Sequence, residues 1–210
     1  MKTDDFQQLF SLPRTAFFHE MEQYADLHHV PIMRLEGMDT LLHLLQLQNA
    51  QTVFEVGAAI GYSALRMAAA NPKRTITTIE RDAERYETAN QFIAKSEHAQ
   101  QISLFHADAL EMDLSEFPER SFDALFIDAA KGQYQLFFDR YAPLVKSGGV
   151  IYSDNIFLNG LTQVPIEQVP RRKRTMVRKL HLFAEHLRTN PDYDSQFYPI
   201  GDGLLVSIKR

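Results

Sequence analysis

Residues 52–63 read TVFEVGAAIGYS. The first five are β-branched or apolar apart from Glu55, which predicts a short, buried parallel strand. Gly57 permits a sharp turn, Gly61 lets the backbone lie close to a ligand, and the next residues open a helix that extends to about residue 70. A strand, a glycine-containing turn and a helix predict a ligand site at the carboxyl edge of a sheet.

The residues of this turn do not match a dinucleotide-binding fingerprint. A dinucleotide fingerprint needs three spaced glycines, and this chain has Gly57, Ala59 and Tyr62 at those positions. Tyr62 is too bulky for the close helix–strand packing that the third glycine permits. Glu55 is a poor neighbour for a pyrophosphate but suits a cation, such as the ammonium or sulfonium region of S-adenosylmethionine. The alternative is an ordinary turn without a ligand.

Length and composition indicate one globular domain that spans residues 1–210. The absence of cysteine excludes disulfides, thiolate zinc sites and a cysteine nucleophile, and it fits a reducing cytoplasm. The acidic opening MKTDDFQQLF is unlike a signal peptide, and no stretch approaches the length of a membrane span. We therefore predict a cytoplasmic protein without a membrane partner. The formal net charge of −5 argues against indiscriminate nucleic-acid binding but allows a local basic patch.

The N-terminal part, residues 1–48, is predicted to be helical. Pro13 interrupts an apolar pattern over residues 3–28, which favours two helices, and Pro31 is predicted to open a third. We expect the apolar positions of these helices to pack in the core and in a homodimer. They are Phe6, Leu9, Phe10, Phe17, Phe18, Met21, Tyr24, Met38, Leu41, Leu42 and Leu45.

The core, residues 52–210, alternates strands and helices. Strands are predicted at 52–56, 74–80, 102–106, 122–127, 150–153, 194–199 and 203–209. Helices are predicted at 62–70, 82–95, 131–144 and 171–188, and a loop at 160–170. This rhythm predicts an α/β fold: a doubly wound, Rossmann-like, mostly parallel seven-stranded sheet that closes with a C-terminal antiparallel hairpin.

Acidic residues follow several predicted strands, where functional side chains of such sheets collect. Glu80 could accept hydrogen bonds from two ribose hydroxyls, and Asp108 with the Ala109 backbone could face an adenine. Each acid could instead be the N-cap of the following helix.

A second group of polar residues ends neighbouring strands. Asp128, Asp154 and Asn155 offer only oxygen ligands, which suit magnesium, manganese or calcium rather than zinc. Lys131 lies one helical turn after Asp128 and is a candidate base. Its alternative is a solvated helix lysine.

Several stretches together resemble the cation-dependent class I O-methyltransferases, which include the catechol and caffeoyl-coenzyme A methyltransferases. They are EVGAAIGYSALRMA, TTIERD, FHADAL, FIDAAKGQY, IYSDNIF and IGDGLLVSIKR. The resemblance runs from about Pro31 to the C-terminus. Within the family the chain looks most similar to the bacterial tRNA 5-hydroxyuridine methyltransferases, because of the turn AAKGQY and a basic helix after the DN loop. Ala59 replaces a glycine that many methyltransferases have.

The resemblance implies a role for each matching residue. Glu55, Gly57, Tyr62 and Ser63 would contact the methionine part of S-adenosylmethionine, and Met33 would lie over the cofactor. Glu80 would bind the ribose, and Asp108 with Ala109 the adenine side. Asp128, Asp154 and Asn155 would hold Mg²⁺ or Mn²⁺, with Asp128 also beside the cofactor and the reacting groups. Lys131 would be the base.

The substrate is left open by this chemistry, because a catechol and 5-hydroxyuracil both present two adjacent oxygens. A basic cluster favours RNA, with residues 171, 174 and 178 on one helical face. The cluster consists of Arg171, Arg172, Lys173, Arg174, Arg178 and Lys179. Its alternative is a solvated helix face.

Three functions follow, in order of preference. The first is methylation of 5-hydroxyuridine to 5-methoxyuridine at the wobble position of a tRNA anticodon loop, with a single-stranded base presented to the site. The second is a catechol or phenolic O-methyltransferase that acts on small molecules. The third is a non-catalytic nucleotide-binding module, since fold alone does not determine function.

Overall fold

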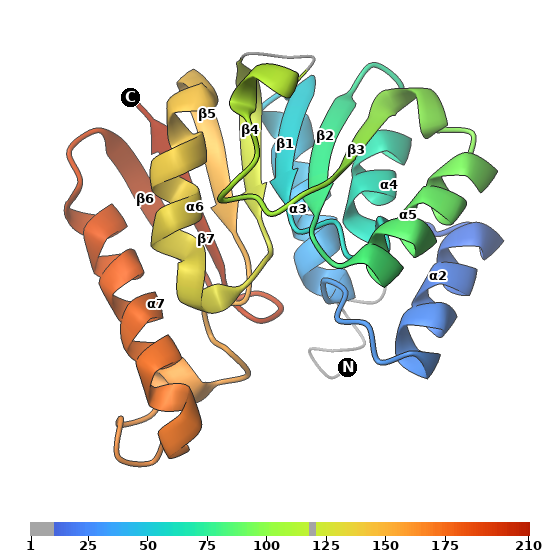
Figure 1. Cartoon of the computed structure of the whole chain (residues 1–210). Coiled ribbons are helices and arrows are strands. Elements are labelled where there is room, and N and C mark those ends of the chain that lie inside the picture. The colour runs from blue at the N-terminus through green and yellow to red at the C-terminus, as the bar shows by residue number, and fades with distance from the viewer. Residues whose placement is uncertain (1–10, 118–120) are drawn as a thin grey trace.

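One seven-stranded sheet forms the centre of the described structure (Figure 1). The computed structural model describes residues 11–117 and 121–210. The strand order is β3-β2-β1-β4-β5-β7-β6; the first five in this order pair in parallel, and β7 lies antiparallel between β5 and β6. The strands are β1 Thr52–Val56, β2 Thr75–Glu80, β3 Ile102–His106, β4 Phe122–Ile127, β5 Val145–Ser153, β6 Tyr193–Tyr198 and β7 Leu204–Lys209. The predicted fold class is confirmed.

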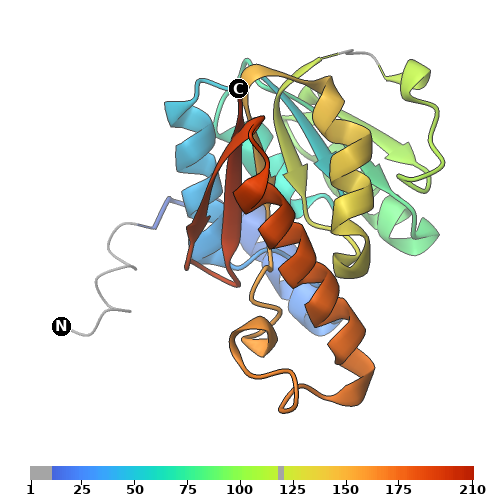
Figure 2. The same cartoon turned by 90° about the vertical axis from the view of Figure 1, so that its left-hand side faces the viewer.

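Helices cover both faces of the sheet, and Figure 2 shows α3 on one side and α6 with α7 on the other. The α-helices are α2 Ala16–Leu27, α3 Leu35–Leu47, α4 Tyr62–Ala69, α5 Ala83–Lys95, α6 Tyr134–Tyr141 and α7 Arg171–Thr189. Short 3-10 helices are η1 Ala99–Gln101, η2 Leu114–Glu116, η3 Lys131–Gln133, η4 Ala142–Leu144 and η5 Leu161–Gln163.

The central strands are buried on both faces, so their sequences are apolar without alternation. In β4, Ala124 and Phe126 join the core shared with α2, α3, α4 and α5. Leu125 and Ile127 point to the opposite core, which α6 and α7 cover. This two-sided burial holds the carboxyl ends of the strands in fixed positions at one edge of the sheet.

Several predicted boundaries were wrong. The helix predicted from Pro31 begins at Leu35, because the backbone of its N-cap Arg34 is extended. The helix predicted over 131–144 is broken into η3, α6 and η4, and η4 contains a proline in its first turn. The strand predicted at 150–153 begins earlier, because β5 starts at Val145, and its pairing with β4 shifts register between Phe122 and Ala124.

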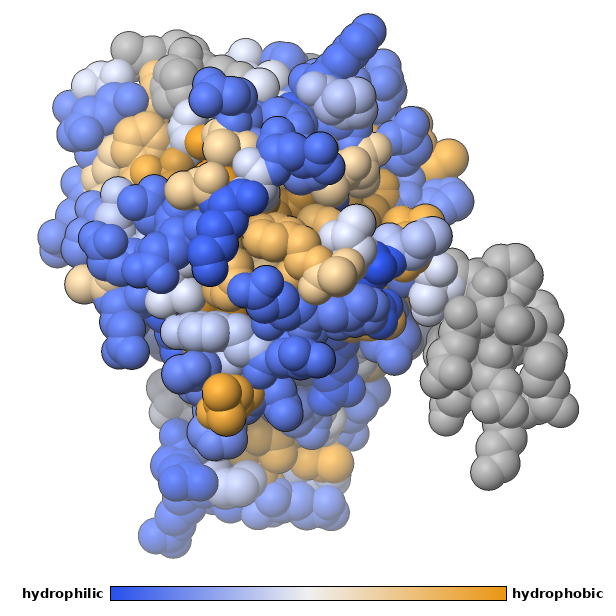
Figure 3. Space-filling view, turned by 90° about the vertical axis from the view of Figure 1, so that its right-hand side faces the viewer, coloured by the Kyte–Doolittle hydropathy of each residue, from blue (hydrophilic) through white to orange (hydrophobic). Residues whose placement is uncertain are grey.

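Most of the apolar positions predicted in α2 and α3 lie inside the subunit, whereas Leu27 and Leu47 at the ends of these helices are exposed. Phe18, Met21, Leu41 and Leu45 are buried in the core beside α4 and α5. They are therefore not available for a dimer interface, and the homodimer remains a prediction without support from them. Figure 3 shows hydrophobic residues on the α2–α5 side in separate areas among hydrophilic ones. The helix predicted around Phe6, Leu9 and Phe10 lies outside the described residues.

No helix in the described part of the chain is long and apolar enough to cross a membrane. The loop predicted at 160–170 is largely irregular, with η5 as a short 3-10 turn inside it. It joins the end of β5 to α7, which lies beside β6 and α6 (Figure 1).

Replacing Leu125 by Ala should destabilise the protein by about 2–5 kcal/mol, because the side chain is fully buried and its removal leaves a cavity. Leu182→Ala is the matched control: this leucine on α7 is 69% exposed, and its loss should change stability by about 0.5 kcal/mol or less. Urea unfolding of both variants measures the two effects. Equal effects would contradict the assignment of Leu125 to the core.

Candidate active site

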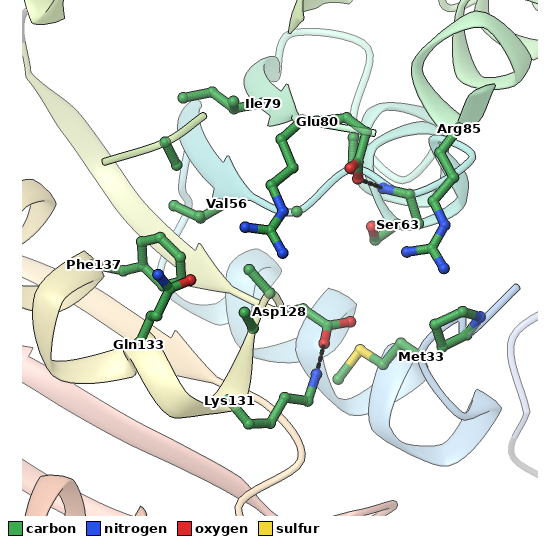
Figure 4. Close-up of a pocket in the computed structure, with 18 of the residues that line it drawn as sticks. Met33, Val56, Ser63, Ile79, Glu80, Arg85, Asp128, Lys131, Gln133 and Phe137 are labelled. Carbon is green, nitrogen blue, oxygen red and sulfur yellow. Dashed lines mark hydrogen bonds and ion pairs between the residues drawn. The ribbon is translucent and has the colours of Figure 1, made fainter. Parts of the chain in front are cut away.

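A cavity of about 290 Å³ opens at the carboxyl edge of the sheet (Figure 4). It is lined by the ends of β1, β2 and β4, by the turn after β3, and by the extended segment of residues 31–33. Ten of the residues predicted for a site line it. They are Met33, Gly57, Tyr62, Ser63, Glu80, Asp108, Ala109, Asp128, Lys131 and Asn155.

Gly57 brings the first turn against the end of β4. Its φ of +101° lies in the region that favours glycine, and a Cβ there would be 2.4 Å from the backbone oxygen of Asp128. The Asp128 amide donates to the Val56 carbonyl at 3.0 Å. The turn after β1 and the polar residues after β4 are therefore in direct contact, and both face the same cavity.

Glu80 is 93% buried at the end of β2, and its carboxylate is held by two backbone amides. Oε2 accepts from the Ala59 amide and Oε1 from the Asp82 amide, each at 2.8 Å. A carboxylate has lone pairs left after these two bonds. Because Glu80 lines the cavity, this arrangement can accept two further hydrogen bonds from a pair of neighbouring hydroxyls.

Glu55 lies behind the cavity and does not line it. The side chain is fully buried, and its two oxygens accept 2.5 Å hydrogen bonds from the hydroxyls of Ser63 and Thr78. Burial raises the pKa of Glu55 to about 7, although both hydrogen bonds lower it. Ser63 does line the cavity, so Glu55 would act on a ligand only through the hydroxyl that it orients.

Tyr62 lines the cavity, but its hydroxyl points to α2. It donates to the Glu22 carboxylate at 2.6 Å and accepts from Arg66 at 2.8 Å, and Arg66 pairs with Asp39 of α3. Burial, followed by the bond to Glu22, raises the pKa of Tyr62 to about 12. This network ties α2 and α3 to the helix that starts at the cavity.

The turn after β3 contributes to the opposite wall. Oδ1 of Asp108 accepts from the Leu110 amide at 2.9 Å, and Oδ2 lies 3.7 Å from the Arg81 guanidinium. Arg81 and Arg85 also line the cavity, although the sequence analysis did not select them. They follow Glu80 in the stretch ERDAER, where charged residues are otherwise typical of a solvated helix start.

The residues after β4, together with Asn155 after β5, form the remaining wall, whereas Asp154 is buried and does not line the cavity. Lys131 begins η3 rather than an α-helix, and its Nζ donates to the Asp128 carboxylate at 2.8 Å (Figure 4). The last residues of β4 and β5 pair with each other, which brings Asp154 and Asn155 beside Asp128. Burial, and then the charge of Asp128, raises the pKa of Asp154 to about 7.

The oxygens of these three residues fit a hard divalent cation. Two carboxylates close together repel each other, and a cation would relieve that repulsion. Within residues 11–117 and 121–210, no three His, Cys, Asp or Glu side chains cluster as a metal site. A site here therefore depends on the Asn155 amide as its third protein ligand.

The basic cluster lies on α7, which packs against η3. Lys179 donates to the Gly132 carbonyl at 3.1 Å, next to Lys131. Arg174 and Lys173 are half-buried, and the Arg174 guanidinium donates to the carbonyls of Glu167 and Val169. Four of the six basic residues are exposed: Arg171, Arg172, Arg178 and Lys179.

A family model for O-methyltransferases matches residues 12–210. The chain belongs to this family. A caffeoyl-CoA O-methyltransferase of Populus kitakamiensis is 30% identical over 207 residues, covering 91% of this chain and 88% of that protein.

Solved structures of O-methyltransferases share the fold. A Staphylococcus aureus structure assigned as a caffeoyl-CoA O-methyltransferase has a TM-score of 0.89 at 31% identity, covering 98% of this chain and 96% of that one. The Bacillus cereus O-methyltransferase, solved in complex with SAH, has a TM-score of 0.83 at 21% identity, covering 99% and 96%.

The buried carboxyl of Glu55 should make stability depend on pH. The folded-state pKa of about 7 exceeds the ordinary value of 4.5, so the folded chain holds a proton that the unfolded chain loses between these values. This contribution is complete below pH 4.5 and is lost as pH rises through 7. Relative to Glu55→Gln, the free energy of unfolding of the wild type should fall by roughly 3 kcal/mol as pH rises through this range.

Urea unfolding of the cofactor-free protein from pH 5 to 8 measures this effect. Glu87→Gln, at an exposed position on α5, is the control for the substitution itself. A difference between wild type and Glu55→Gln that stays constant with pH would contradict the assignment of the raised pKa to Glu55.

Proposed function

We propose that this O-methyltransferase transfers the methyl group of S-adenosylmethionine to the 5-hydroxyl of 5-hydroxyuridine in tRNA, giving 5-methoxyuridine at the wobble position. The observation that carries the choice of RNA is the exposed basic face of α7 beside the turn that holds Lys131. The chain as a whole is acidic, so this local concentration of positive charge requires a reason.

The cavity supports the choice of cofactor. Glu80 can accept from both ribose hydroxyls, and Asp108 with Ala109 lies where the adenine would follow. Met33 and Ser63 line the same cavity as Asp128 and would lie beside the methionine portion. The B. cereus relative, solved in complex with SAH, supports the same assignment.

The proposed metal ligands are Asp128, Asp154 and Asn155, and the ion would be Mg²⁺ or Mn²⁺. When bound, the ion supplies positive charge that favours loss of a proton from a nearby hydroxyl. The protein contributes the position of the ligands at the ends of two paired strands.

The reaction forms an oxygen–carbon bond and breaks the sulfur–carbon bond of the sulfonium. The sulfonium becomes a neutral thioether, and the proton of the acceptor hydroxyl leaves. Lys131, in its neutral amine form, would receive this proton as the general base, and the Asp128 carboxylate, 2.8 Å from its Nζ, orients its side chain. Alignment of oxygen, methyl carbon and sulfur by the cavity walls would provide much of the rate enhancement.

The basic face of α7 can bind phosphates without breaking contacts that hold the fold. Arg171, Arg172 and Arg178 are exposed, whereas Arg174 holds the loop before α7. Lys179 contacts the turn next to the candidate base, so phosphates bound along α7 would lie close to the reacting base. An anticodon loop is single-stranded and can present an unstacked base to the cavity.

The second candidate is methylation of a catechol or phenolic small molecule. It is favoured by the Populus kitakamiensis relative, which carries the name caffeoyl-CoA O-methyltransferase. A catechol supplies the same pair of adjacent oxygens as 5-hydroxyuracil. The two functions therefore differ in what α7 binds, not in the chemistry of the cavity.

The triple variant Arg171→Ala, Arg172→Ala, Arg178→Ala should raise the Michaelis constant for tRNA that contains 5-hydroxyuridine. Each lost phosphate contact should lower the slope of log affinity against log salt by about one unit. Arg174 is left unchanged because it stabilises the loop before α7. Arg188→Ala, at the other end of the same helix, is the matched control and should behave as wild type.

The assay follows conversion of 5-hydroxyuridine to 5-methoxyuridine by mass spectrometry of tRNA nucleosides at two or more salt concentrations. Free catechol and caffeoyl-CoA are assayed in parallel. Catechol methylation should hardly change in the triple variant. Efficient methylation of either small molecule, without any conversion of 5-hydroxyuridine by the wild type, would contradict the tRNA proposal and favour the second function.

A further inference from the structure

The segment that follows Asp154 has an unusual backbone. Asn155, Leu158 and Asn159 have φ values of 58°, 49° and 54°, in the left-handed region that non-glycine residues rarely adopt. Such a run is maintained only where the surrounding structure holds it in place. Asn155 is one of the proposed metal ligands, so whatever holds this segment also determines where its amide lies.

Asp202, at the tip of the β6–β7 hairpin, holds the segment. Its Oδ1 and Oδ2 lie 2.8 Å and 3.1 Å from the amide nitrogen of Asn159, which donates to them. Its own carbonyl accepts from the Phe157 amide at 2.8 Å, and the Gly203 carbonyl accepts from the Ile156 amide at 3.0 Å. The amides of Ile156, Phe157 and Asn159 thus dock the segment onto the hairpin tip.

The hairpin tip is itself packed closely. A Cβ on Gly203, whose φ is +86°, would lie 3.0 Å from the ring of Phe157, and one on Gly201 would lie 3.4 Å from the backbone of Gly37 in α3. The segment also contacts the residue that follows the cavity-lining stretch 31–33, since Arg34 donates to the side-chain oxygen of Asn159 at 3.0 Å. Arg34 directly follows Met33, which lines the cavity.

Asp154 and Asn155 are fixed by different parts of the molecule. The Asp154 carbonyl accepts from the Tyr134 hydroxyl at 2.8 Å, and the Asp154 amide donates to Ile127 of β4. The Asn155 carbonyl instead accepts from the Leu158 amide, inside the segment that Asp202 holds. Asp202 is 93% buried and does not line the cavity, so it would act on a ligand from behind, through this segment or through the charge that it also exerts on Asp154.

We propose that Asp202 is a positioning residue for the metal site: by accepting the Asn159 amide, it holds the left-handed segment that orients the Asn155 side chain. This inference rests on the metal role given to Asn155 in the proposed function. Removing a residue that orients a metal ligand from behind typically weakens metal binding by about 10- to 100-fold.

The experiment measures Mn²⁺ binding by electron paramagnetic resonance in the absence of substrate, together with S-adenosylmethionine affinity by calorimetry. Asp202→Ala should weaken Mn²⁺ binding by about 10- to 100-fold and leave cofactor affinity unchanged. Asp202→Asn should retain most of the Mn²⁺ affinity, because an amide oxygen can still accept from Asn159. Asp194→Ala, at an exposed position of the same hairpin, is the matched control.

Three outcomes would overturn this inference alone. The first is unchanged Mn²⁺ affinity in Asp202→Ala. The second is an equal loss of Mn²⁺ affinity in Asp202→Asn, which would mean that Asp202 acts through its charge. The third is a parallel loss of cofactor affinity, which would mean general damage to the fold. Failure of the wild-type protein to bind Mn²⁺ would instead remove the metal from the proposed function, and the inference with it.

Discussion

The contact between Gly57 and the Asp128 backbone is the constraint on which the site depends. A side chain at Gly57 would collide with the Asp128 carbonyl, so only glycine lets the first turn approach the end of β4 this closely. The same approach places the turn after β1 beside the Asp128–Lys131 pair. The residues proposed for cofactor binding and for proton transfer therefore share one edge of the sheet, as the carboxyl ends of parallel strands allow.

Around this contact, buried polar groups hold the cavity walls from behind. Glu55 orients the Ser63 hydroxyl, Glu80 is fixed by two backbone amides, and Asp202 holds the segment after β5. Each of these acids is buried, so removing its partner would leave an unsatisfied group at a cost of about 1–3 kcal/mol. The rigidity of the walls thus follows from hydrogen bonds that a ligand does not itself make.

Much of the fold and of the candidate site was predictable, because the signals are local. A strand, a glycine turn and acids at strand ends are short patterns, and the topology of a parallel sheet brings them together. The fully buried position of Glu55 and the contacts of Arg174 with loop carbonyls were not predictable. They depend on segments distant in sequence or on loop conformation, as does the direction in which the Tyr62 hydroxyl points toward Glu22. Arg174 in particular shares a helical face with Arg171, and periodicity alone cannot tell a loop anchor from a phosphate contact.

The affinity of Gly57→Ala for S-adenosylmethionine, measured by calorimetry, tests most directly whether the approach of β1 to β4 creates the site. Gly148→Ala is the matched control, because Gly148 has a φ of +77° but nothing lies within 4 Å of a Cβ there. Both variants carry backbone strain, and only Gly57→Ala adds the collision with Asp128. We predict that Gly148→Ala retains wild-type affinity and that Gly57→Ala loses most of it while still unfolding cooperatively. Equal affinity in the two variants would contradict the account.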